Sequence, residues 1–338
     1  MTTMNGMKNG LNGVARLTHL GVIRAMGDDA AKFLHGQLTH DFALLGLEQA
    51  RLAGYCNPKG RLLASVIGFK RSPTEIWLVC PTDILTPTLQ RLMRYVLRAK
   101  VTLADASAEL VVYGLAGDGL RRVLSDTLPN NAKDARLPWS RADVGRATVV
   151  QLYPADGVAR ALWVAPASEA APPGQALSTA LWAYGDVRSG IVTITPAVTE
   201  QFVPQMINFD VVGGVSFKKG CYPGQEVVAR SQFRGTGIPK RRAFLAHSTV
   251  PLTAGDILFA ADDSTGDVTS DAVAPCGLVA QAAAVPASAS TSTAATEGFA
   301  AIVSLHTVAF EAGYVHAHQA FGPKVTLTAA PYPVVADV

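Results

Sequence analysis

Hydrophobic residues in the first part of the chain recur at strand spacing and then at helix spacing. The run 17–25 predicts a strand, and the acidic pair Asp28–Asp29 predicts the start of a helix that ends near Gly36. Two β-branched and aromatic runs, 61–70 and 75–80, are separated by a polar turn and predict a hairpin. This succession favours a mixed module of strands and helices.

A helix that begins at a proline is predicted next. Thr86 precedes Pro87, and apolar residues then follow at helical spacing. Arg91, Arg94 and Arg98 share one face of this predicted helix. A solvated face is favoured over an anion-binding stripe as the explanation of these arginines.

A second module of strands and helices is predicted from about Glu109. Its predicted elements are strands at 110–115, 148–153 and 162–165 and helices at 119–128 and 174–184. Their order lacks the strict alternation and the glycine fingerprint of a dinucleotide-binding fold. We therefore expect an α+β protein with antiparallel sheets and flanking helices.

The last hundred residues differ in character from the rest. From about Arg242, short apolar runs alternate with Gly and Pro, which predicts a small C-terminal β-barrel. Within it, 282–298 is rich in Ala, Ser and Thr and is expected to be a disordered loop. The predicted organisation is a disordered tail (1–16), a first α+β module (17–105), a second (106–190), a motif segment (191–241) and the barrel (242–338).

Composition excludes several classes of protein. The chain has 338 residues, of which 49% are hydrophobic and 16% charged, so a wholly disordered chain is excluded. No apolar run approaches the roughly 18 to 20 residues of a membrane-spanning helix. The first fourteen residues lack the pattern of a secretory signal. We expect a cytoplasmic protein without a membrane partner.

The net charge of +3 is unevenly distributed. Between Ser216 and Arg242 there are seven Lys or Arg and one acid, Glu226. This basic stretch could contact phosphate or a polycarboxylate, yet it lacks a recognised nucleic-acid motif. Direct nucleic-acid binding is therefore not expected.

The cysteine spacing excludes a disulfide framework and a self-contained zinc or iron–sulfur site. The four cysteines are Cys56, Cys80, Cys221 and Cys276, and none belongs to a C-x-x-C pair. His316 and His318 would share a strand face but lack a third ligand, so no metal site is predicted. All the cysteines except Cys221 are expected to be buried and structural.

Cys221 lies in a segment whose neighbours are typical of a site. Gly220 precedes it and Pro223–Gly224 follows, so the backbone is expected to bend and to hold the thiol outward. Lys219 would lower the pKa of such a thiol. The sequence favours a thiolate nucleophile or ligand over a buried structural cysteine.

Other residues are weaker candidates for ligand binding. The amides of Gln205 and Asn208 suit a flat ligand with many hydrogen-bonding edges. Trp182 is either a stacking wall or part of the core, and the core is favoured without further context. Asn57 and Lys59 lie on a predicted turn, where a solvated loop is the ordinary explanation.

These motifs resemble those of the YgfZ family of folate-binding proteins, relatives of the T-protein (aminomethyltransferase) of the glycine cleavage system. The resemblance rests on 219–226 with Arg230 following, and on 33–41, 57–61 and 202–208. Order and spacing agree from about residue 17 to residue 242. The cysteine motif is the most specific of these matches.

The resemblance implies a T-protein-like fold of three domains around an opening that binds a tetrahydrofolate. It also implies a monomeric accessory protein for the assembly or repair of iron–sulfur enzymes, including those that methylthiolate tRNA. On this analogy Cys221 is the functional thiol, Lys219 assists it, and Trp182 lies against the folate. The remaining residues assigned to the folate site are Gln205, Asn208, Tyr222, Gln225, Glu226, Arg230, Asn57 and Lys59.

Departures from the T-protein pattern bear on the reaction. Residues 62–65 offer no acid, and Arg188 stands where a second acid is expected, which argues against glycine-cleavage chemistry. Leu20 replaces an aromatic residue that some YgfZ proteins set against folate. Two alternatives remain: a folate-dependent aminomethyl or one-carbon transferase, and an RNA-binding module that uses the stretch 230–242.

Overall fold

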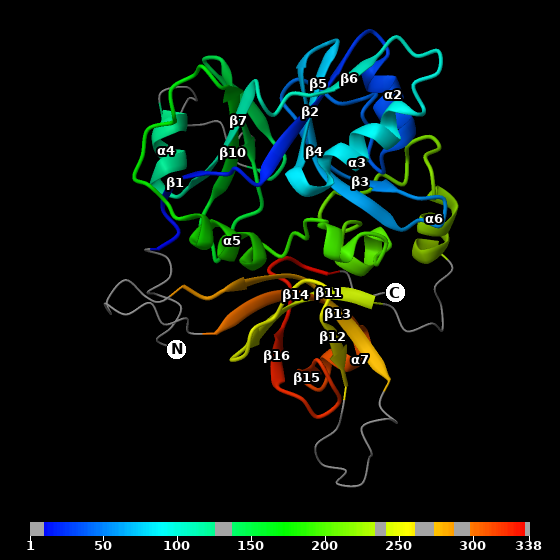
Figure 1. Ribbon diagram of the computed structural model, residues 1–338, viewed down its shortest axis with the longest axis vertical. Helices are drawn as coiled ribbons and strands as arrows, with labels where there is room; N and C mark the ends of the chain where they lie inside the picture. The colour runs from blue at the N-terminus through cyan, green and yellow to red at the C-terminus, as the bar shows by residue number, and fades with distance from the viewer. Residues whose placement is uncertain (1–9, 126–136, 234–240, 261–273, 287–297, 335–338) are drawn as a thin grey trace.

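The chain forms two five-stranded sheets and a closed six-stranded barrel, all of them antiparallel. The computed structural model describes residues 10–125, 137–233, 241–260, 274–286 and 298–334. Figure 1 shows the two sheets side by side at one end and the barrel at the other. Within the described ranges, no helix combines the length and the hydropathy that crossing a membrane requires. The α+β prediction with antiparallel sheets and a terminal barrel is confirmed.

The first sheet carries two helices and has the strand order β3-β4-β5-β2-β6. Its elements are β2 (Leu20–Met26), α2 (Ala30–Gln37), β3 (Ala50–Cys56), β4 (Leu62–Ser72), β5 (Glu75–Pro81), α3 (Thr82–Met93) and β6 (Thr102–Asp105). Phe33 and Leu34 of α2 and Leu92 of α3 are buried in the same cluster as Ile23 and Leu78 of the strands. The predicted hairpin is confirmed as β4 and β5.

The second sheet has the order β1-β7-β10-β9-β8. Its elements are β1 (Gly13–Arg16), β7 (Leu110–Ala116), α4 (Asp118–Ser125), β8 (Arg141–Val144), β9 (Ala147–Gln151) and β10 (Arg160–Pro166). Val22 and Trp77 of the first sheet share a buried cluster with Val112 and Leu162 of the second. The two sheets are therefore joined by a common apolar core.

The barrel closes in the order β11-β14-β13-β12-β15-β16. Its elements are β11 (Arg241–Ser248), β12 (Ile257–Phe259), β13 (Pro275–Ala284), β14 (Phe299–His306), α7 (Thr307–Phe310), β15 (Tyr314–Ala317) and β16 (Lys324–Thr328). Leu258, Val279, Val303 and Val325 are among the residues that fill it. Closure pairs the strand edges with one another, which removes exposed edges.

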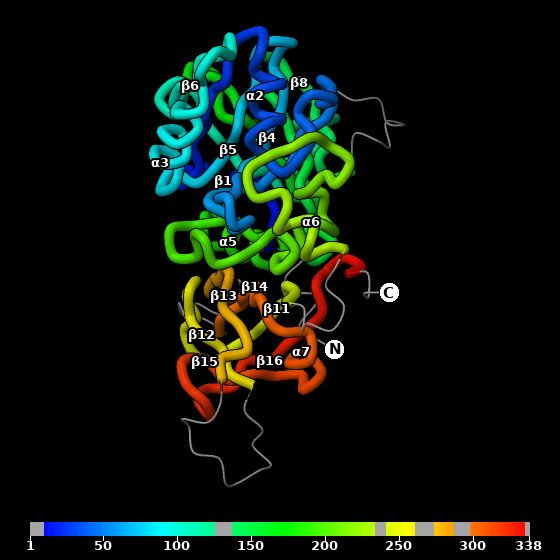
Figure 2. Tube along the Cα trace, turned by 90° about the vertical axis from the view of Figure 1, so that its right-hand side faces the viewer, coloured from blue at the N-terminus to red at the C-terminus, as the bar shows by residue number. Residues whose placement is uncertain are grey.

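A layer of helices and loops joins the sheets to the barrel (Figure 1). Its helical elements are α5 (Thr179–Arg188), the short 3₁₀ helices η2 (Pro196–Val198) and η3 (Pro204–Ile207), and α6 (Gln225–Phe233). One apolar cluster contains Leu62 of β4, Val187 of α5, Phe209 of the layer and Ile302 of the barrel. Seen from the side, the yellow-green chain before α6 faces the viewer and lies below α2 (Figure 2).

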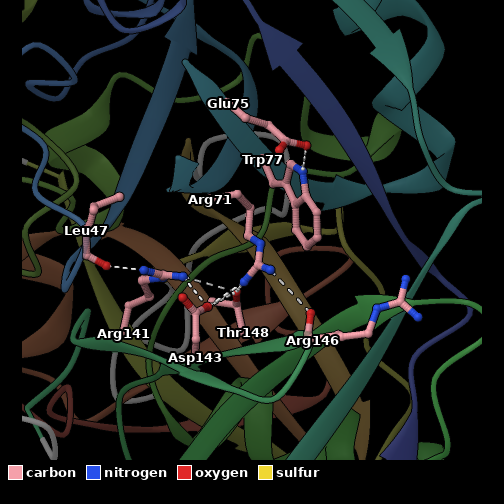
Figure 3. A network of polar contacts seen from close by, with 8 residues as sticks. All are labelled: Leu47, Arg71, Glu75, Trp77, Arg141, Asp143, Arg146 and Thr148. Carbon is pink, nitrogen blue, oxygen red and sulfur yellow. Dashed lines mark hydrogen bonds and ion pairs between the residues drawn. The ribbon is translucent and has the colours of Figure 1, made fainter. Parts of the chain in front are cut away.

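A polar network also ties the two sheets together (Figure 3). Arg71 of β4 donates to the carboxylate of Asp143 and the hydroxyl of Thr148 in the second sheet. Its guanidinium carbon lies 5.0 Å from the ring centroid of Trp77. Arg141 donates to the same carboxylate and to the carbonyl of Leu47. The carboxylate of Asp143 thus joins arginines from both sheets.

Helix α2 begins directly after Asp29 as predicted but without the expected side-chain cap, and the next two predicted helix starts are wrong. Asp29 does not cap α2 with its side chain, because its carboxylate accepts the backbone N–H of Lys100 at 2.7 Å. The next helix, α3, begins at Thr82 and not after Thr86, and Pro87 lies inside it. Helix α5 begins at Thr179 instead of Gly174, with the Ser178 hydroxyl accepting from the N–H of Leu181 at 3.2 Å.

Parts of the predicted tail and of the predicted disordered loop belong to strands. Residues 13–16 form β1, whose backbone pairs with the second sheet and whose Ala15 is buried. Residues 282–284 belong to β13, where they pair with β14. Residues 1–9, 126–128 of the predicted helix, Arg234, Lys240 and 287–297 lie outside the described residues.

Candidate functional site

The cysteine motif is attached to the first sheet through Thr39. The hydroxyl of this buried threonine donates to the carbonyl of Gly214 at 2.6 Å and accepts the N–H of Gly54 at 2.7 Å. Its carbonyl accepts the N–H of Ser216 at 2.9 Å. The chain before Cys221 is therefore fixed to the end of α2 and to β3.

Two glycine turns pack against each other beside the cysteine. Gly224 has φ +82°, and a Cβ atom there would lie 2.4 Å from the carbonyl oxygen of Asn57. Gly60 has φ +73°, and a Cβ atom there would lie 2.9 Å from Cβ of Val227 in α6. Both the left-handed backbone and the close approach require glycine at these positions. The bend predicted around Pro223–Gly224 is present.

Cys221 is exposed, whereas Cys56, Cys80 and Cys276 are buried. Burial raises the pKa of Cys56 and Cys80 to about 12 and, as the main cause, that of Cys276 to about 11. Those three thiols stay protonated at neutral pH, and reagents cannot reach them readily. Of the four cysteines, Cys221 alone combines exposure with a position on a bend.

Lys219 supplies a cation within the motif. Its side chain is buried, its Nζ donates to the carbonyl of Gly220 at 3.1 Å, and Nζ lies 4.4 Å from the ring centroid of Tyr222. Burial lowers the pKa of Lys219 to about 8, although interactions with Asp41 and Cys221 act to raise it. At neutral pH the ammonium group is still mostly protonated, so the motif carries a cation close to Cys221. Tyr222 is buried beneath it, and burial raises the pKa of this phenol.

The predicted residues of α6 lie at its surface. Glu226 and Arg230 form an exposed ion pair of 2.6 Å one helical turn apart. Gln225 is half-buried at the start of the helix, and its N–H donates to the carbonyl of Tyr222. An exposed pair of this kind contributes little to stability. The contact with Glu226 uses one nitrogen of the exposed Arg230 guanidinium, which carries further N–H donors.

The predicted turn residues Asn57 and Lys59 have different roles. The side-chain oxygen of Asn57 accepts the N–H groups of Lys59 and Arg61, which closes the turn. Its amide nitrogen donates to Glu200 at 3.2 Å. The side chain of Lys59 is exposed.

Gln205 and Asn208 point into the protein. Gln205 Nε2 donates to the carbonyl of Val228 in α6 at 2.7 Å. Asn208 has φ +59° and exchanges two hydrogen bonds with the backbone of Ala243 in β11. Both amides are buried and fasten the connecting layer to α6 and to the barrel. Their assignment to a folate site therefore has no geometric support, although the residues hold the motif in place.

A cavity of about 300 Å³ lies elsewhere, between the two sheets and α5. Its apolar walls include Leu52, Val79 and Leu162, and Leu20 also lines it. The polar residues that line it include Ser65, Asp83, Asp186, Thr193 and Gln281. His19 lines the cavity as well. Trp182 is the only residue of the predicted site that lines this cavity. The structure therefore separates the cysteine bend from the cavity.

Trp182 is both a core residue and a wall of the cavity. Its side chain is 1% exposed, and a Cβ atom on Gly114 would lie 2.5 Å from its six-membered ring. The guanidinium carbon of Arg160 lies 4.2 Å from its ring centroid. Most of the ring is thus already used in packing, as the core interpretation predicts.

The cavity contains carboxylates that the sequence analysis missed. Asp186 lines it and forms an ion pair with buried Arg160, and Asp83 lines it as well. Arg188 instead pairs with Asp156 at 2.7 Å. Residues 62–65 and position 188 offer no acid, as the sequence analysis states, but the same helix carries Asp186 two residues before Arg188, and Asp186 lines the cavity. The signal for this acid in the sequence is Asp186 itself, two residues before Arg188 on α5.

No protein-family model matches the chain. It is 33% identical over 233 residues to the tRNA-modifying protein YgfZ of Hamiltonella defensa, a match that spans 66% of either chain. It is 30% identical over 260 residues to the tRNA-modifying protein YgfZ of Vibrio vulnificus, which spans 75% of this chain and 76% of the relative.

The chain belongs to the YgfZ family. The fold of this YgfZ family member also resembles the crystal structure of the glycine cleavage system aminomethyltransferase T from Bartonella henselae. The TM-score is 0.61 at 17% identity, and the match covers 97% of this chain and 89% of that one. At that identity the likeness concerns the fold alone, and it confirms the predicted T-protein-like architecture.

Proposed function

We propose that this YgfZ family member binds a tetrahydrofolate in its cavity and serves as an accessory protein for assembly or repair of iron–sulfur enzymes, including those that methylthiolate tRNA. Its relatives are named tRNA-modifying proteins, and its fold is that of an aminomethyltransferase. The observation that carries the proposal is the exposed Cys221 on a bend held between two glycine turns. Such a thiol can reach a partner protein or its metal cluster.

The residues around the cavity fit a reduced pterin. A volume of about 300 Å³ is at the lower end of the usual range for ligand pockets, and apolar walls with a few polar groups are typical of them. Gln281 Oε1 accepts the N–H of Thr193 at 3.0 Å, which leaves the amide NH₂ as a donor. Asp186 supplies a carboxylate that forms an ion pair with buried Arg160. These groups match the donor and acceptor edges of a pterin.

Bound there, a tetrahydrofolate would supply a carrier of one-carbon units. The residues of this chain would bind and orient it: Asp186 and Gln281 through hydrogen bonds, and Leu52, Val79 and Leu162 by excluding water. The basic side chains Lys59 and Lys218 are exposed on the cysteine side of the molecule and would favour an anionic partner surface.

The experiment combines binding with a cell-based assay. Titration calorimetry should show that tetrahydrofolate binds to the full chain. In a cell that lacks its own YgfZ protein, expression of this chain should restore methylthiolated nucleosides in tRNA. Folate binding without that restoration would contradict the accessory role, and restoration without folate binding would contradict the cofactor.

A folate-dependent one-carbon transferase is the second candidate. Asp83 and Asp186 place two carboxylates at the cavity, which the transferase requires for proton handling. The carboxylate of Asp186 is, however, already engaged by the guanidinium of buried Arg160. Turnover of tetrahydrofolate with an aminomethyl donor would favour this candidate over the accessory role.

A further inference from the structure

We propose that His35, oriented by Asp41, is the base that accepts the thiol proton of Cys221. The inference rests on the proposed function, because it concerns how the functional thiol is activated. It arises from a cluster of titratable groups at the end of α2 that the folate cavity does not include. No residue of this cluster lines the cavity.

Asp41 holds the imidazole of His35 in one orientation. The Nδ1 atom of His35 lies 3.1 Å from Oδ1 of Asp41, and the two side chains are 21% and 19% exposed. The same Oδ1 accepts the N–H of Leu44 at 2.9 Å. Burial alone would raise the pKa of Asp41, but these hydrogen bonds lower it below its usual value. An ionised Asp41 favours a proton on Nδ1, which leaves Nε2 as the free acceptor.

The free Nε2 atom lies against the cysteine bend. A Cβ atom built on Gly220 would lie 3.4 Å from Nε2 of His35. Gly220 directly precedes Cys221 and is exposed, so no side chain at position 220 fills the space beside the imidazole. Asp41 and His35 thus lie beside the backbone that presents Cys221, and Lys219 interacts electrostatically with both Asp41 and Cys221. Thiol-dependent sites combine a nucleophile with a base that a third group orients.

Other charged groups surround the pair. Lys219 of the motif faces Asp41, and its buried ammonium donates to the carbonyl of Gly220. Burial, aided by Arg51, lowers the pKa of His40 to about 4, so His40 binds a proton weakly and is a poorer base than an ordinary imidazole. The N–H of Asp41 donates to Nδ1 of His40 at 2.7 Å. His35 is therefore the imidazole next to the bend that has a carboxylate partner.

The step itself is a proton transfer. The S–H bond of Cys221 breaks, its proton binds Nε2 of His35, and the products are a thiolate and an imidazolium. The carboxylate of Asp41 stabilises the imidazolium, and the ammonium of Lys219 stabilises the thiolate. The step involves no oxidant and no other reactant.

The test measures the alkylation rate of Cys221 by iodoacetamide as a function of pH in the full chain, with peptides assigned by mass spectrometry. The wild-type rate should rise at a pH well below the free-thiol value of about 8.5. In His35→Gln the inflection should move towards that value, and the rate at neutral pH should fall roughly tenfold. Lys32→Gln, which changes an exposed charge on the same helix, should leave the profile unchanged.

Asp41→Asn provides a second, independent variant. It keeps the imidazole and removes its carboxylate, so the inflection should move in the same direction by a smaller amount. Alkylation of the buried Cys56 and Cys80 reports unfolding in every variant. If His35→Gln unfolds, the profile of Asp41→Asn tests the proposal in its place. Profiles of His35→Gln or Asp41→Asn that coincide with wild type would overturn the proposal.

The assay uses neither folate nor a partner enzyme. Failure of the His35 proposal would therefore leave the accessory function untouched. Conversely, a Cys221 that resists alkylation at every pH in the folded wild type would contradict both the base and the thiol role.

Discussion

Gly60 and Gly224 lie so close that a Cβ atom on Gly224 would come within 2.7 Å of the Cα atom of Gly60. The two turns come from segments far apart in the chain, one after β3 and one before α6. Neither can accept a side chain without displacing backbone. This contact fixes the position of the bend that presents Cys221.

Substitution of Gly224 by alanine should destabilise the protein and disturb the cysteine bend. Gly224→Ala adds a Cβ atom at a positive φ and against a backbone carbonyl, so a loss of about 2 to 4 kcal/mol in the free energy of unfolding is expected. Urea unfolding measures it. Gly36→Ala is the matched control, because its helical position has no neighbour within 4 Å and should tolerate the methyl group. Equal stability of the two variants would contradict the packing argument.

The network around Asp143 should contribute to the attachment of the two sheets. Arg71→Met removes the donor that reaches from β4 to Asp143 and Thr148, and a loss of about 1 to 3 kcal/mol is expected. Arg146→Met is the control, since the network uses only the backbone carbonyl of Arg146. Thermal unfolding of the two variants should separate them, and indistinguishable transitions would refute a stabilising role for Arg71.

His40 should make the protein less stable in mild acid. Its folded pKa of about 4 lies below the ordinary 6.5, because burial opposes the charged form. Between these two pH values the unfolded chain binds a proton that the folded one does not, so stability falls as pH decreases through this window. The loss is up to about 3 kcal/mol at the acid end.

The measurement is urea unfolding from neutral pH down to about pH 4. His40→Gln should show a shallower dependence on pH than wild type. His19→Gln, which changes an exposed histidine, should retain the wild-type slope. A slope unaffected by His40→Gln would mean that other groups cause the acid sensitivity.

Folate affinity should depend on the cavity and not on the thiol. Ala183 lines the cavity, so Ala183→Leu should obstruct it and weaken tetrahydrofolate binding about tenfold or more. Ala180→Leu adds the same atoms on the exposed side of α5 and should bind normally. Cys221→Ala should also bind with wild-type affinity, because no residue of the cysteine motif lines the cavity. Weaker binding by Cys221→Ala alone would place the ligand elsewhere.

Local signals in the sequence predicted much of the fold. The β-branched and aromatic runs on either side of the polar turn predicted β4 and β5. The short apolar runs with Gly and Pro after Arg242 predicted the barrel. The sequence prediction places residues 13–16 in a tail and misses their strand. That strand forms by pairing with β7, which is distant in the chain. A strand this short gives no periodic pattern of its own, so only the long-range pairing reveals it.

The candidate site was predictable in part for a similar reason. The glycines and the proline around Cys221 encode a bend, and the bend is present. The direction of the Gln205 and Asn208 side chains depends on α6 and β11, which pack onto them from later in the chain. Asp186 reaches the cavity because α5 packs between the sheets, which no local pattern reports.

The most direct test of the account is whether the sulfur of Cys221 is required in the cell. The measurement is the level of methylthiolated tRNA nucleosides in a cell without its own YgfZ protein that expresses Cys221→Ser or, as control, Cys276→Ser. Both variants must be present at wild-type abundance. We predict that Cys221→Ser leaves these nucleosides at the level of the empty cell while Cys276→Ser restores them. Full restoration by Cys221→Ser would contradict the thiol role.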